Sequence, residues 1–525
     1  MFFESTNNDA NRTRTEYSAR NTSIALVSRI LIIIAGYITR IVFIHTLSED
    51  YVGVNGLFTD IINVLSLSEM GLSTAVTFAL YKPIAEQNRE KIKSLMLFYK
   101  RMYTIVALVV ATIGLILMPF LNVLMKNKPN VDNLYLIYLL YLAGSVTSYL
   151  FVYKKTLIDA NQLSYITSIY YTLVYLIQDI IQIVVLVLTH NFILFLLLNI
   201  VATFILNTMY SSKADRLYPY IKEKNSAPLS KEEHISMRNN IGAMFLHKFG
   251  NVVVDNTDNL IMSAFIGVIE VGIYSNYFLI ITSIRHMFNQ FFDALTASVG
   301  NLAVLSDGKT VKKIFEGTNF IGQWIFGLVS VVIYETINPF VELSFGKTYL
   351  FGKDIVLILC INFFVRGLCQ PTLVFRDSIG LFWVDRYKSI VEAIINIVVS
   401  IILVNKIGLV GIFVGTLIST LTTTFWVEPF VFYRHIKESS MRFFLKMGQY
   451  ILVWAILWYG TDKLCGFAAQ NLGCSLVLTI VVNFVICMVV INPILLLLYF
   501  RTPEFETLKE KAKLLIAKLS ARRHS

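Results

Sequence analysis

Long apolar segments constrain this chain more than any other feature of its sequence. Many stretches are apolar over about 20 residues, the length at which a helix spans the hydrocarbon core of a bilayer. Charged residues form only 15% of the 525 residues and mean hydropathy is +0.65, whereas soluble domains are about 25% charged. The sequence therefore predicts an all-α polytopic membrane protein with about 14 transmembrane helices. The predicted helices cover residues 23–46, 58–80, 103–124, 134–153, 165–189, 192–210, 240–263, 273–297, 314–338, 354–375, 389–404, 409–430, 447–461 and 474–500.

The distribution of basic residues predicts the orientation in the membrane. If the N-terminus is cytoplasmic, 34 of the 45 Lys and Arg residues fall in inner segments and 6 in outer ones. Cytoplasmic loops carry such an excess, so we expect both termini in the cytoplasm. Because the basic residues are spread over eight segments rather than gathered on one surface, the sequence argues against nucleic acid as a partner.

A faint internal repeat predicts two parallel lobes of six helices. The loop around Gly53 resembles the loop around Gly272, 219 residues later, and the same offset places Arg29 on Lys248. Six helices return the chain to the cytoplasm, so the lobes would be related by an axis along the membrane normal. The predicted parts are a cytoplasmic tail (1–22), an N-lobe (23–210), a linker (211–239), a C-lobe (240–446), two further helices (447–500) and a basic cytoplasmic tail (501–525).

Charged and amide side chains recur inside the predicted helices, at spacings that place them on common faces. A charge at the middle of a bilayer costs at least about 2.5–3.5 kcal/mol, so such residues face a protein interior or a wet cavity. We predict that the basic and amide residues bind substrate and that a set of carboxylates couples transport to an ion. The predicted substrate-binding residues are Arg29, Arg40, Lys248, Arg285, Arg366, Asn251, Asn289, Asn362 and Gln370.

The predicted ion-coupling residues are Glu69, Asp255 and Asp258. Glu69 is the first choice because it lies near the middle of its predicted helix, far from both interfaces. Other interpretations stay open. Arg29 and Arg40 could snorkel to an interface, Lys248 with Asp255 could be a structural pair, and Glu69 could be paired to a neighbouring arginine.

Three blocks of the first half carry a family resemblance: residues 51–58 (YVGVNGLF), 65–72 (LSLSEMGL) and 80–83 (LYKP). Residues 255–258 (DNTD) and 271–274 (VGIY) are similar to the start of the family's second half. The chain resembles the Wzx-type polysaccharide flippases of the multidrug/oligosaccharidyl-lipid/polysaccharide exporter superfamily.

The resemblance implies a flippase in the bacterial cytoplasmic membrane, not an enzyme, that uses alternating access. Its substrate would be an undecaprenyl-pyrophosphate-linked oligosaccharide for capsule, O-antigen or exopolysaccharide assembly, with H⁺ or Na⁺ as coupling ion and other assembly proteins as partners. In related flippases, arginines of the first, second and eighth helices bind the pyrophosphate. Arg29 and Arg285 match this pattern, whereas helix two has no basic residue in its interior, and Lys248 is the proposed substitute.

Three other functions remain open. They are an ion-coupled multidrug exporter of the same superfamily, a flippase for teichoic-acid-type precursors and a membrane polysaccharide polymerase. A basic cavity argues against cationic drugs, and the short outer loops argue against a polymerase. No metal-binding or cofactor-binding motif is present in the sequence, so we expect neither a metal nor a cofactor.

Overall fold

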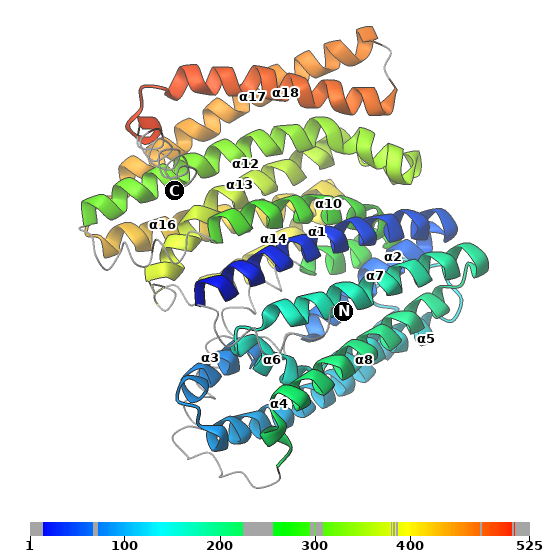
Figure 1. The fold of residues 1–525 in the computed structure, drawn as a ribbon. Coiled ribbons are helices and arrows are strands. Elements are labelled where there is room, and N and C mark those ends of the chain that lie inside the picture. The colour runs from blue at the N-terminus through cyan, green and yellow to red at the C-terminus, as the bar shows by residue number, and fades with distance from the viewer. Residues whose placement is uncertain are drawn as a thin grey trace, which may run out of the picture. The chain divides into compact units, whose positions relative to one another are not determined.

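The computed structural model describes residues 14–66, 72–223, 256–293, 299, 308–379, 381, 384, 387–472, 475–506 and 509. Within these residues every long regular element is an α-helix (Figure 1). Among the described residues, nine helices are long and apolar enough to cross a membrane, and a tenth span results if the pair α5 (Leu134–Ser148) and α6 (Val152–Ala160), bent by 41°, counts as one. The predicted all-α polytopic membrane fold is confirmed.

The chain forms two compact units, residues 1–272 and 273–525. Helix α10 (Val268–Asp293) passes from one to the other. The first unit also contains α1 (Arg14–Thr46), α2 (Glu49–Leu65), α3 (Leu72–Ala85), α4 (Arg89–Leu117), α7 (Ser164–Thr189), α8 (Phe192–Leu217) and a helical segment at 256–265. The second contains α12 (Gly308–Phe345), α13 (Lys353–Ile379), α14 (Lys388–Ile407), α15 (Leu409–Thr422), α16 (Thr424–His435), α17 (Met441–Leu472) and α18 (Leu476–Tyr499).

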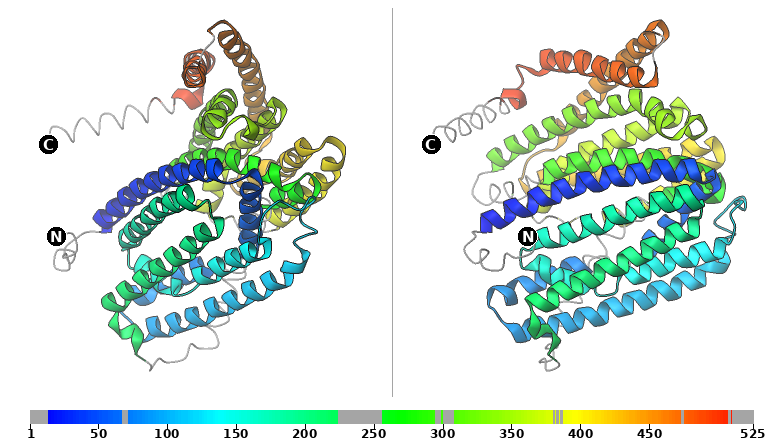
Figure 2. Two further views of the ribbon diagram at one scale, coloured as in Figure 1. Left: turned by 90° about the vertical axis from the view of Figure 1, so that its right-hand side faces the viewer. Right: turned by 45° about the vertical axis from the view of Figure 1, so that its right-hand side comes forward.

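In the first unit α1 packs along α7, and α8 packs against α5, α6 and α7 (Figure 2). The sequence predicts a tight hairpin at 190–191, and the structure confirms it. His190 adopts a left-handed conformation with φ 52° at the end of α7, and the Asn191 side chain accepts a hydrogen bond from the Leu194 N–H at the start of α8. Such a cap satisfies one of the free N–H groups of the first turn.

The structure corrects the start of the second predicted helix. The prediction placed the start at residue 58, but α2 begins at Glu49 and is followed, beyond residues 67–71, by α3. The reason is the pair Glu49 and Asp50 in the first turn, since carboxylates are favourable at the positive end of a helix dipole. This polar pair therefore belongs to the helix rather than to a loop.

In the second unit α12 lies between α13 and α18, and α14 packs on α15. Close approach of α12 to α17 requires a glycine. A Cβ on Gly327 would lie 2.0 Å from Cε2 of Trp454, and the Trp454 indole N–H donates to Gln323 Oε1 at 2.7 Å. The buried tryptophan thus joins α17 to α12 with its polar atom satisfied.

Candidate functional site

The predicted residues of the first helix lie in the first unit. Arg29 is exposed on α1, within electrostatic reach of the Tyr171 hydroxyl of α7, and forms no ion pair with any described carboxylate. Arg40 is half-buried, 5.6 Å from the ring centroid of Phe43, and interacts electrostatically with Tyr141 of α5. Two arginines of one membrane helix therefore lie beside the phenol groups of neighbouring helices.

The predicted residues of α10 and α13 are all within the second unit. Arg285 and Asn289 are half-buried one turn apart on α10, and Arg366 and Gln370 repeat this spacing on α13. Asn362 is buried, and its amide donates to the Phe413 carbonyl of α15 at 2.9 Å. This contact holds α13 against α15. Four of the predicted residues, Glu69, Lys248, Asn251 and Asp255, lie outside the described residues.

Asp258, the one described member of the predicted coupling set, belongs to a buried polar cluster that the sequence analysis missed. It interacts electrostatically with Asp60 of α2, which accepts a hydrogen bond from the Asn259 amide. One turn further along α2, Asn63 donates to Asn256 Oδ1 at 3.3 Å. The cluster thus joins α2 to segment 256–265 through three amides and two carboxylates.

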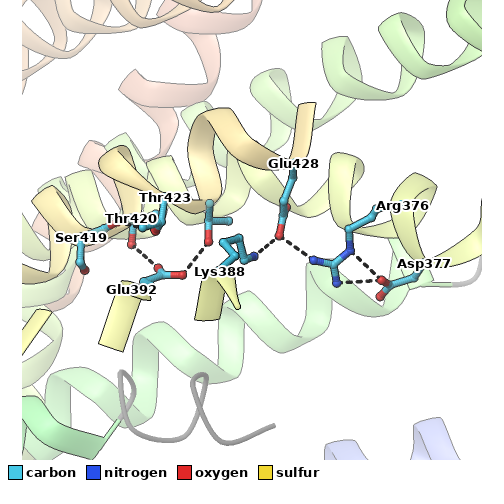
Figure 3. Close-up of polar contacts among 9 residues, drawn as sticks. Arg376, Asp377, Lys388, Glu392, Ser419, Thr420, Thr423 and Glu428 are labelled. Carbon is cyan, nitrogen blue, oxygen red and sulfur yellow. Dashed lines mark hydrogen bonds and ion pairs between the residues drawn. The ribbon is translucent and has the colours of Figure 1, made fainter. Parts of the chain in front are cut away.

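A second buried cluster, also missed, links the ends of three helices in the second unit. Glu428 of α16 is fully buried and accepts from Arg376 Nη1 of α13 at 3.0 Å and from Lys388 Nζ of α14 (Figure 3). Arg376 also pairs with Asp377, Nη2 to Oδ1, at 2.8 Å. Burying these charges is tolerable only because each has a partner of opposite sign.

One helical turn from Lys388, Glu392 extends this cluster. Its Oε1 accepts from Thr420 at 3.2 Å and its Oε2 from Thr424 at 2.6 Å (Figure 3). The spacing of Lys388 and Glu392 at i and i+4 was the only local signal, because it puts both on one face of α14. Arg376 and Lys388 fall between the predicted helices 354–375 and 389–404, so the hydropathy pattern places them in a loop.

Comparison with known proteins reveals the fold but not the family. No family model and no curated protein matches the sequence. Among solved structures, an inward-facing multidrug resistance MATE family transporter of the MOP superfamily is similar over 81% of this chain and 99% of its own, with 14% identity and a TM-score of 0.61. The lipid II flippase MurJ in an inward closed conformation is similar over 91% of this chain and 99% of its own, with 12% identity and the same TM-score, 0.61.

This chain has the fold of these transporters. An outward-facing MATE family transporter of the MOP superfamily is similar over 79% of this chain and 96% of its own, at 14% identity and a TM-score of 0.52. The fold that was expected from the family resemblance is therefore confirmed. Sequence identities of this size give no information about the substrate.

Proposed function

We propose that the protein is a flippase that moves an undecaprenyl-pyrophosphate-linked oligosaccharide from the inner to the outer leaflet, for capsule, O-antigen or exopolysaccharide assembly. The observation that carries the proposal is the placement of arginines within helices of a transporter fold. Arg29, Arg285 and Arg366 lie in α1, α10 and α13, each several residues from both ends of its helix. Guanidinium groups bind phosphate oxygens in a bidentate manner, so they suit a pyrophosphate head group.

The physical requirements of the substrate fit this arrangement. A lipid-linked saccharide has an anionic head, a polar sugar and an apolar tail. The head can cross the bilayer only in a cavity that replaces its hydration, whereas the tail can stay in lipid. Cations at the middle of the transport path would lower the cost of carrying the head, and alternating access would expose them to one leaflet at a time.

The arginines favour a flippase over the alternative, a multidrug exporter, because a cationic drug would be repelled by cations along its path. A teichoic-acid-type precursor shares the same anionic chemistry and remains the nearest variant of the proposal.

Removing the gene from its bacterium tests this proposal. The surface polymer should be lost and its lipid-linked repeat unit should accumulate in the inner leaflet, while sensitivity to cationic drugs stays unchanged. A normal surface polymer together with increased drug sensitivity would instead support the multidrug exporter.

The proposed orientation, with both termini in the cytoplasm, makes a separate prediction. Ser212 is exposed near the end of α8 and Asn127 is exposed in the connection after α4. In intact cells a membrane-impermeant thiol reagent should label Asn127→Cys and leave Ser212→Cys unlabelled, and both should react after permeabilisation. The reverse pattern would invert the orientation.

A further inference from the structure

Asp60 is a buried carboxylic acid that has no cation beside it among the residues that the structure describes. It lies in α2, is 8% exposed, and is followed along the chain by the buried Ile61. The one charged group that acts on it in the described part of the chain is another carboxylate, Asp258. Of the helices that pack on α2, α5 provides Tyr141, but this phenol donates to Asn55 and interacts with Thr59 rather than with Asp60.

An ionised Asp60 is expensive in these surroundings. Burial removes the hydration of a carboxylate, and a second carboxylate nearby adds repulsion. The hydrogen bonds from the Asn259 and Asn63 amides compensate only part of this cost. A bound proton removes both penalties together, because the neutral acid is neither strongly hydrated nor repelled.

Asn259 can form a hydrogen bond with Asp60 whether Asp60 is ionised or protonated. The residue is 5% exposed, its Nδ2 donates to Asp60 Oδ2, and its Oδ1 is buried without a hydrogen-bond partner among the described residues. Rotation of the amide group by half a turn would turn Oδ1 towards Asp60. A carboxylate would then accept from Nδ2, and a carboxylic acid would donate to Oδ1, with one hydrogen bond in each state.

The Asp60–Asn259 pair lies in a seam, which we define as the contact of α2 and residues 121–126 with residues 256–272. At one end of the seam the backbones touch, because a Cβ on Gly53 would lie 2.1 Å from the Val268 carbonyl oxygen. Farther along, Ser263 Oγ donates to the Leu124 carbonyl at 2.6 Å, and the Lys126 N–H donates to the Ser263 carbonyl at 3.0 Å. These contacts join uncharged groups, whereas the buried carboxylates of Asp60 and Asp258 can gain and lose protons.

We propose that Asp60 is a proton-binding site that controls this seam. One proton passes from water to an Asp60 carboxyl oxygen, and the neutral acid, hydrogen-bonded to Asn259, stabilises contact between α2 and segment 256–265. When the proton returns to water, the repulsion between Asp60 and Asp258 and the cost of burial favour separation. On the proposed function, which this inference presupposes, the proton gradient would bias alternating access through this site.

Infrared difference spectroscopy tests the proton site directly, with the full chain in lipid vesicles and no transport substrate. When the pH is raised from acidic to alkaline, the spectrum of the wild type should lose the C=O stretching band of a protonated carboxylic acid. Asp60→Asn should lack this difference band, and Asp60→Glu should keep it at a shifted frequency. Asp258→Asn should keep the band but lose it at a lower pH than the wild type, because the repulsion is gone. An unchanged band in Asp60→Asn would overturn the proposal, as would a band in the wild type that responds to Na⁺ but not to pH.

The effect on the seam has its own measurement. A disulfide between Asn63→Cys and Asn256→Cys should form several-fold faster at acidic than at alkaline pH, and adding Asp60→Asn should make the rate fast at both. If the rate of disulfide formation still depended on pH in the Asp60→Asn protein, Asp60 would not control the seam. Neither experiment needs the lipid-linked saccharide. If the protein gave the expected infrared and disulfide results but did not move that lipid, the proton site would stand and the flippase proposal would be refuted.

Discussion

Replacing Glu428 with alanine should destabilise the second unit strongly, by about 3–5 kcal/mol, the range for removing one partner of a buried ion pair. Glu428 is fully buried and is shared by Arg376 and Lys388, which are themselves almost completely buried. Without Glu428, the cations Arg376 and Lys388 remain buried close together and lose the carboxylate that they share. The unfolding temperature of the purified protein in detergent measures the effect.

The chain provides a matched control in Glu438, which follows α16 and forms an ion pair with Lys312 of α12 at 2.9 Å. The hydrogen bond from Lys312 lowers the pKa of Glu438, but both side chains are open to water. Screening makes such a pair weak, so Glu438→Ala should unfold close to the wild-type temperature. If Glu428→Ala also unfolds there, Glu428 does not hold the three helix ends together.

Transport should be nearly abolished when the arginines proposed to bind pyrophosphate are removed. A hydrogen bond to a charged group is worth about 1.5–3 kcal/mol, so each of Arg29→Ala and Arg285→Ala should lower transport by about 10- to 150-fold. Arg285→Lys should restore only part of the rate, because an ammonium keeps the charge but loses the bidentate geometry. Surface polymer in cells that express each variant at the wild-type level is the measurement.

Arg442 supplies the control for these variants. It is exposed in the first turn of α17 and belongs to none of the predicted sites. Arg442→Ala should therefore export polymer normally. Normal export by both Arg29→Ala and Arg285→Ala would remove the two residues from the substrate path.

Hydropathy was sufficient to predict the fold, because a membrane helix must satisfy its backbone hydrogen bonds within one apolar segment. The hairpin at His190 and Asn191 follows from the same local information. The end of a helix was harder to predict. The predicted second helix starts at residue 58, only two residues before Asp60, whereas Asp60 lies 11 residues beyond the true start at Glu49.

The buried clusters could not be predicted in this way. Arg376 and Glu428 are separated by 52 residues, and Asp60 and Asn259 by 199. No helical periodicity connects residues so far apart, and each partner alone looks like a polar residue close to the end of an apolar segment. Only the packing of α13 on α16, and of α2 on segment 256–265, shows that these side chains meet.

The proposed flippase activity is measured most directly by following a fluorescent undecaprenyl-pyrophosphate oligosaccharide in vesicles that contain the purified protein. A membrane-impermeant reagent that modifies the sugar reports which leaflet holds the lipid. We predict that the wild type equalises the lipid between the two leaflets and does not move a cationic dye. The double variant Arg29→Ala, Arg285→Ala should leave the lipid in its original leaflet. Transport of the dye by the wild type, with the lipid left in its original leaflet, would contradict the proposed function.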